Sequence, residues 1–433
     1  MSSAAIQARE LLENAFPGRI TTPDSKKSFE TERERPWSQS CWLPAAAYVV
    51  LSTTREVVSA LAVVRKTGCK FAIRTSGHNP NVGFSSVDGS GVVLDLRGLK
   101  GRTLGDNNVL HAGGGCVWGD IYPFLEEHGR SPIGGRETQV GLGGFLTGGG
   151  YPAFSSFYGI GPDSVKGCEV VVLADGSIFE ANAHNHAELW RALKGGTSNF
   201  AIVTRFDIEV HPLIKAKFII KLYDPSDFAN INAATISVQE AIEKDPKLNL
   251  FTNCNKQFVA VIMIYADSPA GFPKAFQPFD KLSSHLNTVV PPTDGTVFTV
   301  VKTLSTMGHV AQSLSRKIGC VTTKISVDLY DEVNKCWQEA IKKVPEGGTL
   351  HYTVQPVATA AVQAGKDRGA EKIAKDKDLH LDFICPSFAG AKQNVLRGFG
   401  QKNLQDLKEV AAKYDPEGVF QKQQSGGFLL RDA

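Results

Sequence analysis

The sequence predicts an α+β protein built from two parts. Three observations carry this prediction. Short β-like runs alternate with helical runs as far as about residue 206, and longer strands then alternate with longer helices. The glycines cluster between residues 77 and 200, in the first part. The chain has 433 residues, 42% hydrophobic and 21% charged, which is enough for two or more domains of about 100–200 residues each.

The first part is expected to begin with a short helix over residues 5–15, followed by an irregular arm over Phe29–Trp42. Ala47–Ser52 then predicts a strand, and Thr54–Thr67 carries apolar residues at helical spacing. The remaining elements expected in this part are strands Cys69–Ile73, Val92–Leu96 and Val109–Gly113, helix Cys116–His128, hairpin Val170–Ala174 with Ser177–Glu180, and helix Ala187–Leu193.

The second part is expected to form one antiparallel sheet with helices on its outer face. Its strands are predicted over Lys217–Leu222, Gln257–Tyr265, Thr349–Val357 and His380–Cys385. Its helices are predicted over residues 228–243, 270–282, 297–314, 327–343 and 391–413.

Composition excludes several classes of function. A net charge of +3 is too small to indicate a nucleic acid or an anionic membrane as partner. No apolar run approaches the ~18 residues of a membrane span, and the first 20 residues lack the apolar core of a signal peptide, so we expect a cytoplasmic protein. The eight cysteines form no CxxC pair, which favours reduced thiols over disulfides or a metal site.

The loop from Arg74 to Phe84, RTSGHNPNVGF, lies between two apolar runs. Glycine and serine leave its backbone accessible, so several N–H groups could approach a phosphate. His78 stands in the middle of this loop. It is either a surface side chain without a function or part of a ligand site, and the loop alone leaves both interpretations open.

A second glycine-rich stretch covers residues 134–150, with six glycines between Gly141 and Gly150. Glycine costs about 0.5–1 kcal/mol relative to alanine inside regular structure, so turns alone explain this density poorly. A long flat ligand lying against the backbone explains it better. The common nucleotide and hydrolase motifs GxGxxG, GxxxxGK[ST], GxSxG and HExxH are all absent.

Four motifs occur in a fixed order along the first part. They are Arg-x-x-Gly-His at 74–78, Val-Gly-x-Gly-Gly-x-x-x-Gly-Gly-Gly at 140–150, Tyr-Gly-x-x-x-Asp at 158–163 and Gly-Gly-x-x-Asn-Phe-x-Ile-Val-Thr at 195–204. This order resembles the FAD-binding domain of the vanillyl alcohol oxidase superfamily. The closer similarity is to its berberine bridge enzyme-like branch, which includes fungal oxidases of secondary metabolism.

The resemblance implies a two-subdomain PCMH-type FAD-binding domain over residues 1–206, to which 389–433 returns, and a substrate domain over 207–388. It implies FAD as cofactor, joined covalently through its 8α-methyl group to His78. Some members add a bond from a cysteine, but Glu137 stands at that position, so we expect a single link. Val140 stands where related proteins control oxygen access, and favours an oxidase over a dehydrogenase. The residues expected to contact FAD are Arg74, Thr75, Ser76, Gly77, His78, Asn79, Gly83, Phe84, Val140, Gly141, Gly143, Gly144, Thr147, Gly148, Gly149, Gly150, Tyr158, Gly159, Ile202 and Val203.

Oxidation of an alcohol or amine at a flavin also requires a base for the O–H or N–H proton. Strand alternation places His351 and Gln355 on one face of the strand Thr349–Val357, and Asp382 on one face of the following strand. These three residues are the catalytic candidates. The alternative that these polar side chains simply face solvent stays open.

The leading prediction is an FAD-dependent oxidase of a small lipophilic secondary metabolite, with hydride transfer to flavin N5 and reoxidation by O2. The reaction would be alcohol oxidation or oxidative cyclisation. A non-redox cyclase on the same scaffold is the alternative, because Cys385–Gly390 departs from the Asn- and Tyr-bearing segment usual in this branch. A third possibility is a flavin-binding protein without turnover. We expect a small-molecule substrate and O2 as partners, no nucleic acid, no membrane, and a monomer or weak dimer.

Overall fold

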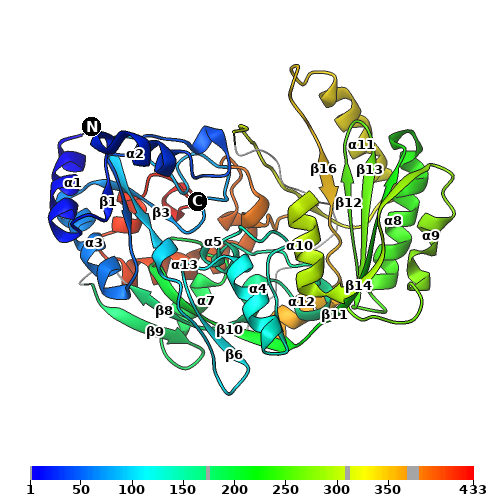
Figure 1. Ribbon diagram of the computed structural model, residues 1–433, viewed down its shortest axis with the longest axis horizontal. Coiled ribbons are helices and arrows are strands. Elements are labelled where there is room, and N and C mark those ends of the chain that lie inside the picture. Colours follow the sequence, from blue (N-terminus) through cyan, green and yellow to red (C-terminus); the bar gives the residue numbers. More distant parts are fainter. Residues whose placement is uncertain (1, 172–175, 308–312, 368–379) are drawn as a thin grey trace.

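The computed structural model describes residues 2–171, 176–307, 313–367 and 380–433. The chain forms two parts that lie side by side (Figure 1). The part on the left of the view holds both termini and two sheets, and the part on the right holds one sheet with helices. Helix α10 (Val297–Met307) packs where the two parts meet.

The first sheet positions the loop that contains His78. Its strands β2, β4 and β3 run parallel, and β3 is connected to β4 by this loop. Parallel strands of one sheet need crossover connections, and helix α3 (Thr54–Thr67) supplies the one between β2 and β3, which lie on either side of β4. Thr53 caps α3 by accepting a hydrogen bond from the Glu56 N–H, and Gly68 ends it at φ 68°. The strands, in sheet order, are β1 (Ile20–Thr21), β2 (Ala47–Val50), β4 (Gly91–Asp95) and β3 (Lys70–Arg74).

The second sheet is antiparallel and is centred on the long strand β10, which pairs with β6, β8 and β7. The pairing with β7 continues to Pro212, so this sheet extends beyond residue 206. Helix α4 (Trp118–Glu127) covers it with the fully buried side chains of Trp118, Ile121 and Leu125. The strands are β5 (Arg102–Leu104), β6 (Val109–Gly113), β7 (Arg130–Pro132), β8 (Val165–Val171), β9 (Ile178–Asn182) and β10 (Ile202–Pro212).

The third sheet is antiparallel with helices on its outer face, as predicted. Its outer face packs through side chains such as Leu250 and Met263 against helices α8 (Phe228–Ile242) and α11 (Val327–Ile341). Its inner face packs through Phe218 and Ile262 into the core of the first part. The strands, in sheet order, are β14 (His285–Thr296), β11 (Lys215–Tyr223), β13 (Val259–Tyr265), β12 (Leu248–Cys254) and β16 (Tyr352–Val354).

Strands β12 and β14 are absent from the sequence prediction. The apolar/polar alternation of β12 is interrupted at Phe251, which lies on the same face as Asn249 and Asn253, and at Thr252, which lies on the apolar face. β14 contains Pro291 and Pro292, which argue against a central strand. The sheet accommodates them because β14 is an edge strand and needs no full ladder of N–H donors.

Other predicted bounds need correction. The arm at Phe29–Trp42 begins inside helix α2. The strand expected over Thr349–Val357 is only the three residues of β16, and the one expected over His380–Cys385 is only the two residues of β17, which pairs with β15 outside the main sheet. The 3₁₀ and loop segments before α13 break the helix expected over 391–413, and α9 is much shorter than the helix expected over 270–282. The elements concerned are α2 (Lys26–Arg33), α9 (Gln277–Asp280), β15 (Thr322–Thr323), β17 (His380–Leu381) and α13 (Gln401–Tyr414). The end of the expected helix 297–314 and the turn of the hairpin 170–180 include residues 308–312 and 172–175, which lie outside the described residues.

The C-terminal segment returns to the loop that contains His78. The Ser425 hydroxyl donates to the Gly83 carbonyl at 2.6 Å, and the Asn81 amide donates to the Ala389 carbonyl at 2.9 Å. These bonds join residues more than 300 positions apart and fix the loop from its outer side. Among the described residues, no helix combines the length and the apolarity needed to cross a lipid bilayer.

Candidate functional site

A cavity of about 410 Å³ is lined mainly by residues of the first part, together with Ile318 and residues 386–388. The loop containing His78, the glycine-rich stretch, the segment before β10, residues 386–388 and the C-terminal segment all contribute to its wall. Fourteen of the residues predicted to contact FAD line it: Thr75, Ser76, Gly77, His78, Asn79, Phe84, Val140, Gly141, Gly143, Gly144, Thr147, Gly148, Ile202 and Val203.

The loop containing His78 is held by backbone and hydroxyl contacts. Gly77 adopts φ +75°, and a Cβ there would lie 3.1 Å from the Pro36 Cα, so this position requires glycine. The Trp37 N–H donates to the Gly77 carbonyl at 3.0 Å, which ties the N-terminal arm to the loop. The Ser76 hydroxyl accepts a hydrogen bond from the Gly141 N–H at 3.1 Å, which ties the loop to the glycine-rich stretch.

The His78 imidazole is packed against an aromatic ring. It stacks on the Trp37 indole with ring centroids 4.6 Å apart and planes 9° from parallel, and the Arg316 guanidinium lies over the same indole at 4.1 Å. Burial lowers the pKa of His78 to about 4, an effect that the charge of Glu137 opposes and the charge of Arg316 strengthens. The imidazole is therefore neutral at pH 7, the form whose ring nitrogen can act as a nucleophile.

The glycines of the 141–150 stretch serve different purposes. A Cβ on Gly141 would lie 2.6 Å from Thr75 Cγ2, and one on Gly150 would lie 2.3 Å from the Phe145 ring. These two glycines are required by packing within the protein. Gly144 has no such neighbour within 4 Å and lines the cavity, so it is the glycine whose missing side chain leaves room for a ligand.

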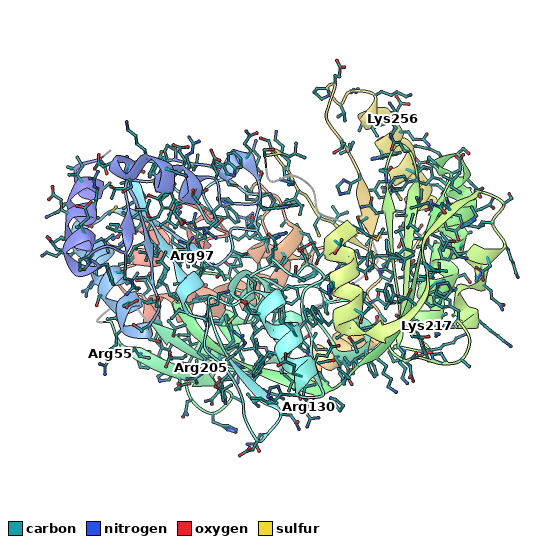
Figure 2. The ribbon with its side chains drawn as sticks, in the orientation of Figure 1. Arg55, Arg97, Arg130, Arg205, Lys217 and Lys256 are labelled. Atoms are coloured by element: carbon teal, nitrogen blue, oxygen red, sulfur yellow. The ribbon has the colours of Figure 1, made fainter. Side chains whose placement is uncertain are left out.

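Arg74 lies outside the cavity wall. Its guanidinium is 1% exposed, and it donates from Nε to Asp95 Oδ2 and from Nη2 to Glu32 Oε2, both at 2.7 Å. Arg97 completes the cluster and lies within the left part of the molecule in Figure 2. Burial alone would raise the pKa of Glu32, but the hydrogen bond from Arg97 and the charges of both arginines lower it. Arg74 therefore anchors the end of β3, where the loop begins.

Five other residues expected to contact FAD are also outside the cavity wall. They are Gly83, Gly149, Gly150, Tyr158 and Gly159. Tyr158 stacks on His211 with ring centroids 3.8 Å apart. Gly159 adopts φ +89°, and a Cβ there would lie 2.6 Å from Asp163 Oδ2, so this glycine serves a tight turn.

The three catalytic candidates do not line the cavity either. His351 is exposed and precedes β16. Asp382 is exposed and lies beside Arg397 and Lys408 in a separate hollow near α13. Gln355 approaches the cavity only through another residue, because its Oε1 accepts a hydrogen bond from Arg136 Nη2 at 2.5 Å.

Several residues of the cavity wall were not predicted from the sequence: Trp37, Ser85, Arg136, Tyr151 and Phe388. Arg136 lies within the glycine-rich stretch, directly after Gly134 and Gly135, and this position was the available signal. Trp37, Tyr151 and Phe388 come from segments far apart in the chain, and no local pattern brings them together.

One buried polar atom of the cavity wall lacks a partner. The Ser85 hydroxyl makes no hydrogen bond to any residue that the structure describes. Buried hydroxyls are normally satisfied, but this oxygen has almost no accessible surface, so it gives no evidence for a ligand in the cavity. A cavity at glycine-rich loops, the open position at Gly144 and the neutral His78 together fit a nucleotide-linked planar cofactor such as FAD.

Comparison with known proteins agrees with this fit. Residues 45–182 match the family described as FAD binding domain. The FAD-dependent monooxygenase macF from Penicillium terrestre is 28% identical, over 92% of this chain and 84% of its own length. The FAD-dependent monooxygenase yanF from Aspergillus niger is also 28% identical, over 94% and 76%.

Solved structures share the fold. The glucooligosaccharide oxidase of Acremonium strictum superposes with a TM-score of 0.78 at 18% identity, covering 95% of this chain and 96% of its own. The 6-hydroxy-D-nicotine oxidase of Arthrobacter nicotinovorans gives 0.76 at 17% identity, covering 94% and 97%. The berberine bridge enzyme-like protein 1 of Physcomitrella patens gives 0.76 at 16% identity, with 99% of each chain covered.

Proposed function

We propose a reaction for this chain on the basis of its family, the FAD-linked oxidoreductases with the fold of the vanillyl alcohol oxidase and berberine bridge enzyme-like flavoproteins. The chain oxidises a small, lipophilic secondary metabolite, by oxidation of an alcohol or by oxidative ring closure, with O2 as the final electron acceptor. Residues 1–206 and 389–433 hold the cofactor, and residues 207–388 cover the substrate. The largely apolar cavity wall, which includes Val140, Phe145 and Phe388, supports a lipophilic substrate.

FAD is held through the loop containing His78 and the glycine-rich stretch, with His78 as the single covalent attachment. The structural relative from Acremonium strictum is described as carrying a 6-S-cysteinyl, 8α-N1-histidyl FAD. In this chain the described cavity wall contains His78 but no cysteine, and Glu137 is among its residues. This supports one link in place of two.

When bound, FAD supplies a two-electron acceptor that takes a hydride at N5 and is reoxidised by O2. The chain must then supply a proton acceptor for the substrate. Glu137 is the carboxylate of the described cavity wall, and we assign this role to it in place of His351 and Asp382. Tyr151 is less suitable, because burial raises its pKa to about 12 and its hydroxyl donates to the Pro356 carbonyl.

The observation that carries the proposal is a partly buried, neutral His78, stacked on Trp37 in the wall of a cavity that the glycine-rich stretch also lines. The test is acid denaturation of the purified protein followed by gel filtration. Wild-type protein should keep its yellow colour, and His78→Ala should release it. His184→Ala is the matched control, because His184 is exposed. Release of all colour from denatured wild-type protein would contradict the covalent link.

The curated relatives favour a second candidate, since they are named monooxygenases. An oxidase removes two electrons and two protons from its substrate and passes them to O2, which becomes hydrogen peroxide. A monooxygenase transfers one oxygen atom of O2 to the product and consumes an external reductant. Turnover under ¹⁸O2 separates them, because only the second reaction labels the product with oxygen from O2. These relatives give no support to the non-redox cyclase.

A further inference from the structure

Arg136 places a positive charge in the cavity wall opposite the third sheet. Its guanidinium lies over three aromatic rings, at 4.8 Å from the centroid of Phe251, 5.4 Å from Tyr151 and 5.9 Å from Phe388. Phe251 belongs to β12, Tyr151 follows the glycine-rich stretch, and Phe388 follows the third sheet. The cation therefore lies where the expected cofactor part and the expected substrate part come together.

No carboxylate neutralises this charge within the described part of the chain. Its one hydrogen bond there is to the Gln355 side-chain carbonyl, although a guanidinium carries five N–H donors. Burial lowers the pKa of Arg136, and the groups that oppose this effect are Tyr151, Cys385 and Tyr122, none of which is a carboxylic acid. A guanidinium nevertheless stays charged at pH 7.

Arg74 shows how the same chain treats a buried arginine that serves structure alone. Arg74 binds two carboxylates, Asp95 and Glu32, at 2.7 Å. Arg136 is only partly buried, but it lies among aromatic rings without such a partner, which is unfavourable for a charge. Its place in the cavity wall therefore favours an anionic ligand that supplies the missing partner. The surrounding rings favour a ligand with a flat conjugated body, because aromatic faces stack on such groups.

We propose that Arg136 recognises an anionic oxygen group on a planar, conjugated substrate, either a carboxylate or an ionised phenol. This inference rests on the proposed function and names its substrate class. Gln355 orients the guanidinium through their hydrogen bond, and Tyr151, Phe251 and Phe388 surround it. Gln355 is thus a positioning residue for substrate binding, which replaces the catalytic role expected from the sequence.

The test is equilibrium binding of benzoate, 4-nitrophenolate and the neutral analogue benzamide to the purified flavoprotein. Binding is followed by the change in flavin absorbance and, independently, by calorimetry. Wild-type protein should bind at least one of the two anions at least tenfold more tightly than benzamide. Arg136→Gln should lose at least tenfold in affinity for that anion but not for benzamide, and Arg136→Lys should retain part of it. Arg55→Gln is the control, since Arg55 is exposed on the outer edge of the left part (Figure 2).

Equal affinity for the anions and benzamide in wild-type protein would overturn the proposal. So would unchanged anion binding in Arg136→Gln. The proposal is also overturned if Arg136→Gln weakens the sulfite adduct of the flavin and leaves anion binding intact. The charge of Arg136 would then act on the cofactor and not on the substrate. The flavin content of each preparation is measured first. Protein without flavin would contradict the proposed function, whereas full flavin content without anion selectivity contradicts only the role of Arg136.

Discussion

Replacement of Arg74 by methionine tests whether this residue stabilises the loop containing His78 from within the protein or contacts the cofactor. The change removes two charge-assisted hydrogen bonds of 2.7 Å and leaves Asp95, which is 0% exposed, with the Arg97 backbone N–H at 2.9 Å and a weaker contact to the Arg97 guanidinium at 3.4 Å. Removal of one partner from a buried ion pair costs about 3–5 kcal/mol, and because Arg97 remains we expect about 3 kcal/mol. The exposed pair between Arg65 and Glu417 provides the control, for which Arg65→Met should cost about 0–1 kcal/mol.

The assay is urea denaturation followed by far-ultraviolet circular dichroism, with FAD content measured for each variant. Arg74→Met combined with Asp95→Asn should cost less than the sum of the two single changes, because the double variant leaves no unpaired carboxylate at position 95. The account is refuted if Arg74→Met is no more destabilising than Arg65→Met and yet loses FAD. That result would place Arg74 at the cofactor after all.

Three further predictions follow from the cavity. Gly141→Ala should destabilise the fold, because the new Cβ would lie 2.6 Å from Thr75 Cγ2. Gly144→Ala should leave urea denaturation of the flavin-free protein unchanged but weaken FAD binding. Equal effects of the two variants on stability and on FAD binding would contradict the separate roles of these two glycines. Since burial lowers the pKa of His78 to about 4, below the 6.5 of a free histidine, its neutral form persists as pH falls. Covalent attachment of FAD to flavin-free protein should therefore be nearly as fast at pH 5 as at pH 7, whereas a histidine with pKa 6.5 would slow by a factor of about 20–30. Glu137→Gln should lower kcat about 100-fold while FAD stays attached, measured by O2 consumption once a substrate is known; unchanged kcat would exclude Glu137 as the proton acceptor.

The sequence predicts the first part of the fold well, because its elements carry local signals. Helix α3 has a threonine cap, a regular apolar face and a terminal glycine, and its bounds agree with the prediction. The third sheet is harder to predict, since β14 contains two prolines and the alternation of β12 is interrupted at Phe251 and Thr252. Their strand conformation depends on neighbours in the sheet, which a single sequence does not reveal.

The cofactor side of the site is also more predictable than the substrate side. Residues from Thr75 to Asn79 are contiguous in the sequence and line the cavity together. Arg136, Tyr151 and Phe388 come from three segments and form one cluster only after folding. Arg74 was expected to contact FAD because it stands in the loop motif. Its partners are instead the carboxylates of Glu32 and Asp95, which lie 42 and 21 positions away in the sequence, so no local pattern predicts them.

The central claim is that this chain carries FAD covalently on His78. The most direct measurement is the intact mass of the denatured protein, with its absorbance spectrum and a peptide map. The account predicts a mass increase of one FAD, a flavin spectrum that remains with the denatured chain, and a modified peptide that contains His78. A chain of unmodified mass that releases its flavin on denaturation, or a flavin bound to a different residue, would contradict it.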